Sequence, residues 1–254
     1  PFDRLVNGSG MNISEEFLHR FGCSPTITVR APGRVNLLGE HVDYNDGIVL
    51  PAAIDRSVRL AATPTEDDIV RLHAIDLKQQ TAFRLEALEQ RVDLGGKSLP
   101  NWAAYPAGVA WALAQAGLPV RGMQAVYTSD VPIGAGLSSS AAVEVAFAAA
   151  WRALGGWEID NLQLARLCQR AENGYVGVNS GLMDQFASAC GVEGHALYFD
   201  TRSLEWHPVA LPPGTAIVVA DSGMRRSLAT SAYNERRSAC EKAVAQLQQY
   251  KPGL

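Results

Sequence analysis

Apolar and polar residues alternate in several short stretches of this chain and recur with helical spacing in several longer ones. Alternation with a period of two predicts β-strands, and apolar residues at i, i+3, i+4 and i+7 predict amphipathic helices. We therefore expect strands at 26–30, 48–53, 57–62, 69–75, 81–85, 123–129, 195–200 and 215–220. We expect helices at 13–21, 101–116, 141–154 and about 231–250, one that begins after Asp160, and one that starts near 182–186.

Capping residues and turns set the expected ends of these elements. Ser14 is a candidate N-cap of the first helix and Gly22 a candidate stop. Asp160 can cap a helix whose apolar face includes Leu164, Leu167, Cys168 and Ala171. The charged segment 65–68 is expected to be a hairpin turn between two strands.

A glycine- and serine-rich segment, DVPIGAGLSSSAA (130–142), joins the expected strand 123–129 to the expected helix 141–154. Glycines let the backbone turn and approach a ligand closely, and free N–H groups at a helix start attract anions. We interpret the segment as a phosphate-binding loop whose serines can donate hydrogen bonds or bind a metal carried by a nucleotide. The loop residues are Gly134, Ala135, Gly136, Leu137, Ser138, Ser139 and Ser140. The alternative is an ordinary turn with one serine as N-cap.

The spacing within this loop excludes three other motifs. A Walker loop needs lysine beside the residue five places after its first glycine, but Ser139 stands there without a lysine neighbour. The dinucleotide fingerprint needs a glycine at that same position. A nucleophile elbow centred on Ser138 needs glycine where Ser140 stands. A phosphate loop of another type remains.

A second polar segment, 31–47, lies between apolar runs and holds five side chains suited to binding hydroxyl groups. Carboxylates accept hydrogen bonds from O–H groups, while arginine and amide side chains donate them. The five are Arg34, Asn36, Glu40, His41 and Asp43. The alternative is a solvated connecting loop.

Four further residues have two possible roles. Trp102 and Tyr105 lie on the apolar face of the helix 101–116, so they can belong to the core or stack against adenine. Glu172 follows the apolar stripe of its helix by one residue, which places it at the edge of the buried face or in solvent. Asp184 lies near a helix start, where a carboxylate is favourable through the helix dipole alone.

Composition narrows the class of partner. A chain of 254 residues with 47% hydrophobic residues can form one large domain or two small ones. A net charge of -4 and a pI near 5.8 argue against nucleic acid and anionic membranes as partners and favour a small ligand. Four separated cysteines favour buried free thiols in a reducing compartment, and no segment is long enough to cross a membrane or shaped like a signal peptide. We expect a cytoplasmic protein whose natural N-terminus precedes Pro1.

Four segments resemble galactokinases. GRVNLLGEHVDY (33–44) is similar to the galactokinase signature, and the loop 132–142 is similar to the ATP-binding motif of the wider family of galacto-, homoserine, mevalonate and phosphomevalonate (GHMP) kinases. GLMDQ (181–185) and the segment 227–241, which contains YNERR (233–237), also resemble galactokinases in the same order. The similarity covers nearly the whole chain.

This resemblance implies a two-domain α+β fold with the site in the interdomain cleft. The N-terminal GHMP kinase domain would span 1–185, and 186–254 would begin an incomplete C-terminal domain, because a third glycine-rich motif of the family has no match here. The implied partners are two small molecules, galactose and ATP, with a monomer favoured.

The resemblance also implies the role of each site residue in transfer of the ATP γ-phosphoryl group to the C1 hydroxyl of galactose. Asp184 would be the base and Arg34 its cationic companion. Ser140 and Glu172 would bind Mg²⁺, and the loop from Gly134 to Ser139 would hold the phosphates. The sugar would be bound by Glu40, His41, Asp43, Gly181 and Tyr233.

Three alternative hypotheses for the function remain. The first is a non-catalytic sugar sensor of the same fold, against which the intact SSSAA (138–142) counts. A kinase for N-acetylgalactosamine or arabinose is the second. A serine hydrolase built on Ser138 is the third, and it lacks the elbow spacing.

Overall fold

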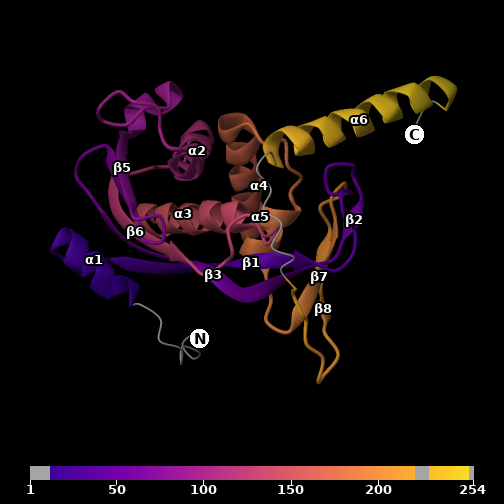
Figure 1. The fold of residues 1–254 in the computed structure, drawn as a ribbon, viewed down its shortest axis with the longest axis horizontal. Coiled ribbons are helices and arrows are strands. Elements are labelled where there is room, and N and C mark those ends of the chain that lie inside the picture. The colour runs from indigo at the N-terminus through magenta and orange to yellow at the C-terminus, as the bar shows by residue number, and fades with distance from the viewer. Residues whose placement is uncertain (1–11, 221–228, 252–254) are drawn as a thin grey trace.

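A five-stranded sheet organises most of the chain. The computed structural model describes residues 12–220 and 229–251, and Figure 1 shows the arrangement. The strand order is β1-β3-β6-β4-β5, and every pairing is antiparallel except that of β4 with β6. The strands are β1 (Ile27–Asn36), β3 (Pro51–Pro64), β4 (Ile69–Ala74), β5 (Gln79–Arg84) and β6 (Met123–Ser129). The expected strands in these regions are confirmed, although β1 runs six residues further than 26–30 and β3 merges two expected strands.

The expected hairpin at 65–68 is wrong, because β6 inserts between β3 and β4. The backbone N–H of Thr65 donates to the carbonyl of Gly122, just before β6 (2.9 Å). Gly122 has no room for a side chain, since a Cβ there would lie 2.1 Å from the carbonyl oxygen of Asp67. The segment 65–68 therefore wraps around the start of β6 instead of closing a hairpin.

Helices cover both faces of this sheet. On one face, α1 (Ile13–Phe21) buries Phe17 against Ala61 and Val126. The residues next to these in β3 and β6 point to the opposite face and join the main core, since side chains alternate along a strand. That core is completed by α2 (Asn101–Gln115), α3 (Ser139–Gly155) and α4 (Asn161–Ala171), with a 3₁₀ helix, η1 (Leu85–Gln90), that was not expected.

Two of the three expected capping residues are confirmed. Gly22 ends α1 with φ 73°, and the Asp160 side chain accepts from the N–H of Gln163 (2.7 Å) at the start of α4. The expected N-cap Ser14 is wrong: Asn12 caps α1, and the N–H of Ser14 donates to its side chain. α1 consequently begins one residue before the expected cap.

A smaller sheet lies beside the large one and has its own core. It consists of β2 (Ile48–Val49), β7 (His195–Asp200) and β8 (Trp206–Ala210), of which β8 was not expected. Helix α5 (Met183–Cys190) packs on it through Phe186, whose ring stacks on Phe199 with centroids 4.0 Å apart. The expected domain boundary at residue 185 falls inside α5 and stays a prediction.

The strand expected at 215–220 is wrong. This segment has no regular structure, and Ile217, Val218 and Val219 are 38%, 88% and 49% exposed. Its β-branched residues favour a strand, but a strand also needs a neighbour to pair with, and none of the described strands pairs with it.

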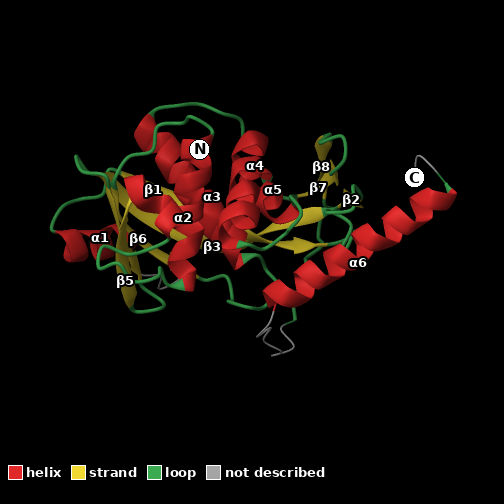
Figure 2. Cartoon of the chain, turned by 90° about the horizontal axis from the view of Figure 1, so that it is seen from above, coloured by secondary structure: helices red, strands yellow, loops and turns green. Residues whose placement is uncertain are grey.

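The last helix, α6 (Ala229–Tyr250), agrees with the expectation for 231–250 and runs outward from the rest of the chain (Figures 1 and 2). Its start is attached to a loop near the end of α4. Asn234 accepts from the N–H of Asn179 (3.0 Å), and Arg237 donates to the carbonyl of Asn179 (3.1 Å). None of the described helices is both long and apolar enough to cross a membrane.

The cysteines are free, as expected, but their burial differs from one to another. Cys168 and Cys190 are buried, whereas Cys240 is half-buried and Cys23 is exposed, so the expectation of buried thiols is confirmed for the first two and wrong for Cys23.

Phe186→Ala is expected to lower the free energy of unfolding by about 3–5 kcal/mol, because it removes a fully buried ring and leaves a cavity between α5 and the small sheet. Urea denaturation measures the change. Leu94→Ala, at a half-exposed position, is the control and should change stability by less than about 0.5 kcal/mol. Equal losses in the two variants would contradict this role of Phe186.

Candidate active site

The glycine- and serine-rich loop connects β6 to α3 through three left-handed backbone positions. Gly134 and Gly136 have φ angles of 73° and 77°, which glycine adopts without strain. Ser138 also has a positive φ, 57°, and stands at the N-cap of α3 without capping it through its side chain. The first N–H groups of α3 have no intrahelical acceptor, so this end of the helix can bind an anion.

Arg34, Asp184 and the loop meet in one place. Arg34 donates from Nε to Oδ1 of Asp184 (2.8 Å) and from Nη1 to the carbonyl of Gly136 (2.7 Å), and its Nη2 forms an ion pair with the same Oδ1 at 2.6 Å. Ser138 donates its hydroxyl to the other carboxylate oxygen of Asp184 (2.5 Å). The two charged side chains are only 13% and 27% exposed. A carboxylate, a cation and a loop that can bind an anion therefore share one site.

The local structure of β1 lets Arg34 come close to the glycine- and serine-rich loop. The β1–β3 register shifts between Pro32 and Arg34, and the N–H of Arg34 donates to the carbonyl of Leu137 (3.2 Å). A Cβ on Gly33 would lie 2.8 Å from that carbonyl oxygen, so only glycine lets the strand pass this close to the loop.

Asp43 lies against Gly181 beside the Arg34–Asp184 pair. A Cβ on Gly181 would fall 2.1 Å from a carboxylate oxygen of Asp43, and the N–H of Met183 donates to that carboxylate. Burial, reinforced by the nearby charge of Asp184, raises the pKa of Asp43 to about 6, while Arg34 and the backbone hydrogen bonds act in the opposite direction.

Glu40 and His41 lie at the exposed rim of this region. Glu40 accepts from the amide of Asn36 (3.2 Å), and Nδ1 of His41 lies 2.8 Å from the hydroxyl of Tyr44. The side chain of Tyr233 lies outside the described residues, although α6 contacts the loop that precedes Gly181.

Glu172 is buried, with 6% exposure, which corrects the expectation that it lies at the edge of the helix face or in solvent. The cause is a π-helical turn, Glu172–Val176, that extends α4 and points the carboxylate inward. It accepts hydrogen bonds from the side chains of Ser140, Ser180 and Gln185. Burial raises its pKa despite these donors.

Sequence reasoning missed three residues around Glu172: Ser180, Gln185 and Glu144. Glu144 is fully buried and accepts from the amide of Gln185 (2.9 Å). One signal could have drawn attention to it, because it is the single charged residue of the alanine-rich stretch AAVEVAFAAAW (141–151).

The two aromatic candidates occupy different surroundings. Tyr105 lies close to Glu172 and Glu144, and burial followed by their charges raises its pKa to about 12. Trp102 donates to the side-chain oxygen of Gln79 (2.5 Å) and packs 6.1 Å from the ring of Tyr127. Stacking of either residue on adenine stays a prediction.

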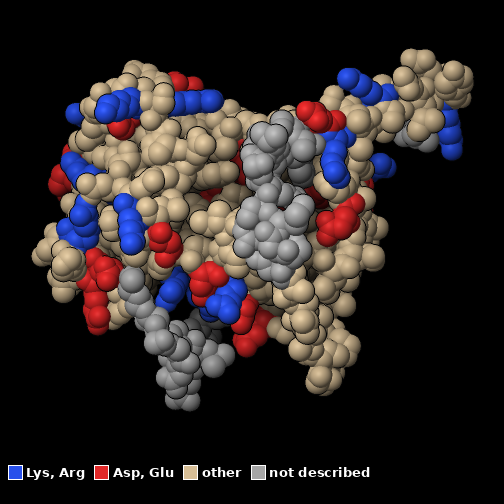
Figure 3. Space-filling model, in the orientation of Figure 1, with Lys and Arg blue, Asp and Glu red and all other residues tan. Residues whose placement is uncertain are grey.

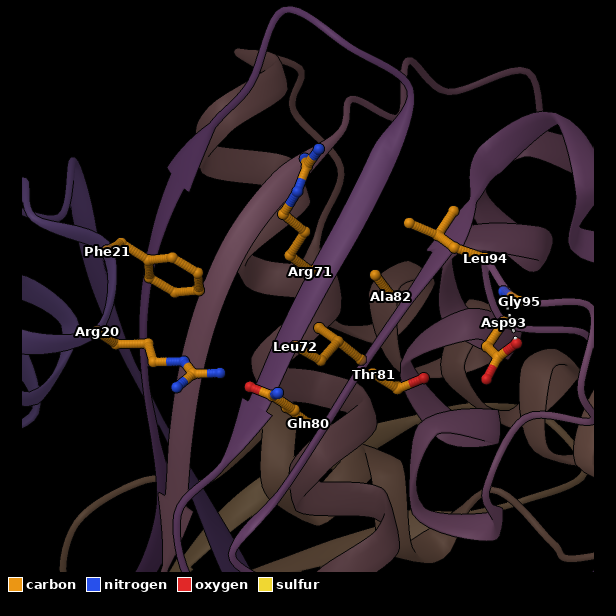
Figure 4. A pocket seen from close by; sticks show the side chains of 10 residues that line it. All are labelled: Arg20, Phe21, Arg71, Leu72, Gln80, Thr81, Ala82, Asp93, Leu94 and Gly95. Carbon is orange, nitrogen blue, oxygen red and sulfur yellow. Dashed lines mark hydrogen bonds between the residues drawn. The ribbon is translucent and has the colours of Figure 1, made fainter.

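A hollow of about 380 Å³ lies elsewhere, at the β4–β5 edge of the large sheet (Figure 4). None of the residues that the sequence nominated lines it. Its main polar groups form hydrogen bonds and ion pairs within the protein, since Arg71 pairs with Asp67 (2.7 Å) and the Asp93 carboxylate accepts from the N–H groups of Gly95 and Lys97.

Among the described residues, the surface charge shows no large patch of one sign on the face seen in Figure 3, where basic and acidic side chains are interspersed.

Comparisons with known proteins show what this chain is similar to. The galactokinase galactose-binding signature matches residues 15–64, and the GHMP kinase N-terminal domain matches residues 104–192. A galactokinase of Roseiflexus sp. (strain RS-1) is 48% identical over 95% of this chain, and one of Streptomyces coelicolor is 44% identical over 92%. The chain spans 60% of the length of both relatives.

Solved structures give the same fold. The galactokinase of Lactococcus lactis complexed with galactose superposes with a TM-score of 0.81 at 31% identity, over 93% of this chain and 61% of that one. The mevalonate kinase of Methanococcus jannaschii superposes with a TM-score of 0.57 at 19% identity, over 72% of this chain and 55% of that one, which concerns the fold alone. The fold is therefore that of the GHMP kinases, α+β with an incomplete second domain. Over more than nine tenths of its length the chain is therefore similar to galactokinases.

Asp43→Asn is expected to change how stability depends on pH. Because the pKa of Asp43 is raised from 3.8 to about 6 in the folded state, the folded protein binds more protons than the unfolded chain between these values. This residue's contribution to stability is therefore present at low pH and is lost as the pH rises through about 6. The variant should gain about 2–3 kcal/mol relative to the parent between pH 4 and 7, measured by urea denaturation. Parallel curves for parent and variant would contradict the raised pKa of this carboxylate.

Proposed function

We propose that this chain carries the active site of a galactokinase, which transfers the γ-phosphoryl group of ATP to the C1 hydroxyl of α-D-galactose and yields galactose 1-phosphate and ADP. The meeting of Arg34, Asp184 and the loop at Gly136 supports this proposal most directly. Phosphoryl transfer depends chiefly on positioning and charge stabilisation, so the base and the phosphate site have to be neighbours. The similarity to a galactokinase complexed with galactose supports the choice of sugar.

Asp184 is the proposed base, which orients the C1 hydroxyl and accepts its proton. Arg34 holds Oδ1, while Oδ2 accepts the hydroxyl of Ser138. The sugar hydroxyl can replace Ser138 as the donor to Oδ2, because both are neutral O–H groups. The transition state is loose, so a well-placed carboxylate suffices even when it is paired with an arginine.

Arg34 is proposed to act on the phosphate as well. Its guanidinium contacts both Asp184 and the carbonyl of Gly136, so it lies between the base and the phosphate loop. Positive charge at this position offsets the negative charge on the transferring group. Gly134, Ala135, Leu137 and the serines of the loop would hold the phosphates through backbone N–H and hydroxyl groups.

The sugar would be bound by the polar groups on the other side of Asp184. Asp43 and Glu40 offer carboxylates, and His41 offers a ring nitrogen. Gly181 has no side chain to separate its backbone from Asp43 and is proposed as a backbone contact to the sugar. Tyr233 is proposed as a further sugar contact from the resemblance alone.

Mg²⁺ would be held by Ser140 and Glu172. Both side chains offer oxygen ligands, which this hard cation prefers. The hydroxyl of Ser140 also donates a hydrogen bond to the Glu172 carboxylate, so the two lie side by side. The described residues contain no cluster of three or more His, Cys, Asp or Glu side chains suited to a metal. Such an ion neutralises charge on the nucleotide phosphates when bound.

Sugar-dependent ADP release from MgATP by the intact protein tests this function. Galactose should support release, and N-acetylgalactosamine, arabinose and glucose serve as comparison sugars. Binding of galactose and ATP without ADP release would favour the non-catalytic sensor, and a preference for a comparison sugar would change the substrate.

Asp184→Asn is expected to lower kcat by about 10²–10⁴-fold and to keep galactose affinity, since an amide can position the sugar but cannot accept its proton. Steady-state kinetics and calorimetric sugar binding give the two values. Asp68→Asn is the control, because this carboxylate belongs to an ion pair with Arg84 that is 36% and 47% exposed, and its kcat should not change. Near-normal kcat in Asp184→Asn would remove the base from the scheme.

We also propose a monomer that resides in the cytoplasm. The free cysteines fit a reducing compartment. Sedimentation of the intact protein at several concentrations tests the oligomeric state.

A further inference from the structure

Glu144 is a buried carboxyl group to which the proposed mechanism gives no task. It lies on α3 one helical turn after Ser140, and its exposed fraction is zero. Its Oε2 accepts from Nε2 of Gln185 (2.9 Å), and the same nitrogen donates to Oε2 of Glu172 (2.8 Å). One amide thus connects two carboxyl groups from two different helices.

The contact between Glu144 and Gln185 lacks one hydrogen-bond donor. The two hydrogens of the Gln185 amide are both used, one for each carboxyl group. Oε1 of Glu144 and Oε1 of Gln185 are buried and have no hydrogen-bond partner among the described residues. Two buried acceptors on adjoining side chains are costly, whereas one proton between them would satisfy both.

An ionised Glu144 would also lack a cation. None of the ion pairs among the described residues involves it, and an isolated buried charge is strongly unfavourable. Burial, together with the charges of Glu172 and Asp184, raises its pKa well above the ordinary value.

We propose that Glu144 is a neutral carboxylic acid that pairs with the side-chain amide of Gln185, and that this pair positions Glu172 and Asp184. The acid O–H would donate to Oε1 of Gln185 while the amide donates to Oε2 of Glu144, so each partner gives and accepts one hydrogen bond. The second amide hydrogen is then directed at Glu172.

This pair reaches the proposed active site along two routes. Gln185 is the neighbour of Asp184 in the first turn of α5, so fixing its side chain limits rotation of that turn. Glu172 contacts Ser140, its proposed partner in binding Mg²⁺. Glu144 is therefore a positioning residue, and this catalytic consequence rests on the proposed function.

Two substitutions distinguish a neutral acid from a carboxylate. Glu144→Gln keeps the shape, donates where the acid proton would be and accepts where Oε2 is, so it should keep the pair. Glu144→Leu has a similar volume but removes both hydrogen bonds of the pair, which leaves one N–H and the oxygen of the Gln185 amide without a partner. Cys168→Ala, at a buried position beside Glu144, is the matched control for a disturbed core that keeps the pair.

The first measurement needs no activity. Infrared spectra at neutral pH should contain the C=O stretch of a protonated carboxylic acid in the parent and in Cys168→Ala, and Glu144→Gln should lose it. In NMR spectra, slow solvent exchange of the Gln185 side-chain amide should persist in Glu144→Gln and be lost in Glu144→Leu. An unchanged band in Glu144→Gln, or no band in the parent, overturns the neutral acid.

The second measurement is kinetic. Glu144→Leu should lower kcat by about 10–100-fold and raise the Mg²⁺ concentration needed for half-maximal rate, while the KM for galactose changes little. Glu144→Gln and Cys168→Ala should both keep most of kcat. If Cys168→Ala loses as much as Glu144→Leu, or if Glu144→Gln fails like Glu144→Leu although it is folded, the positioning role is wrong. If the parent releases no ADP with any sugar, the proposed function fails while the spectra still decide the acid–amide pair.

Discussion

The contact of Arg34 with Asp184 is the constraint on which the site depends. It joins β1 to α5 across 150 positions of sequence, and the same guanidinium binds the carbonyl of Gly136 in the phosphate-type loop. Opposite charges attract more strongly when partly shielded from water, but they need further hydrogen bonds to offset the loss of hydration. The Gly136 carbonyl and the Ser138 hydroxyl supply these bonds. The pair therefore holds a strand, a loop and a helix in a single geometry.

Around this pair the chain concentrates carboxyl groups, which is unfavourable for stability and typical of functional sites. Each of them is accommodated in a different way. Asp43 accepts a backbone N–H and has a raised pKa, whereas Asp184 is paired with a cation. Glu172 is surrounded by side-chain donors from three segments of the chain. Glu144, in our proposal, avoids the cost of a charge by keeping its proton.

Small side chains bring the helices close enough for these contacts. The buried face of α3 consists largely of alanine, which lets the helix lie directly against β1 and β3 and carries Ser138 and Ser140 to the site. On the other side, Phe186 anchors α5 to the small sheet. Asp184 and Gln185 are thus positioned by packing on one side and by hydrogen bonds on the other.

The sequence by itself determined the features that depend on neighbours along the chain. Periodicity located most strands and helices, and local turn chemistry identified the loop at 134–140 and the cap at Asp160, because the forces involved act within a few residues. Only the tertiary structure decided that β6 inserts between β3 and β4, that 215–220 has no strand to pair with, and that Glu172 turns inward to meet Gln185 and Glu144. These outcomes depend on which distant segments come together, and a local pattern carries no information about the partner it will meet.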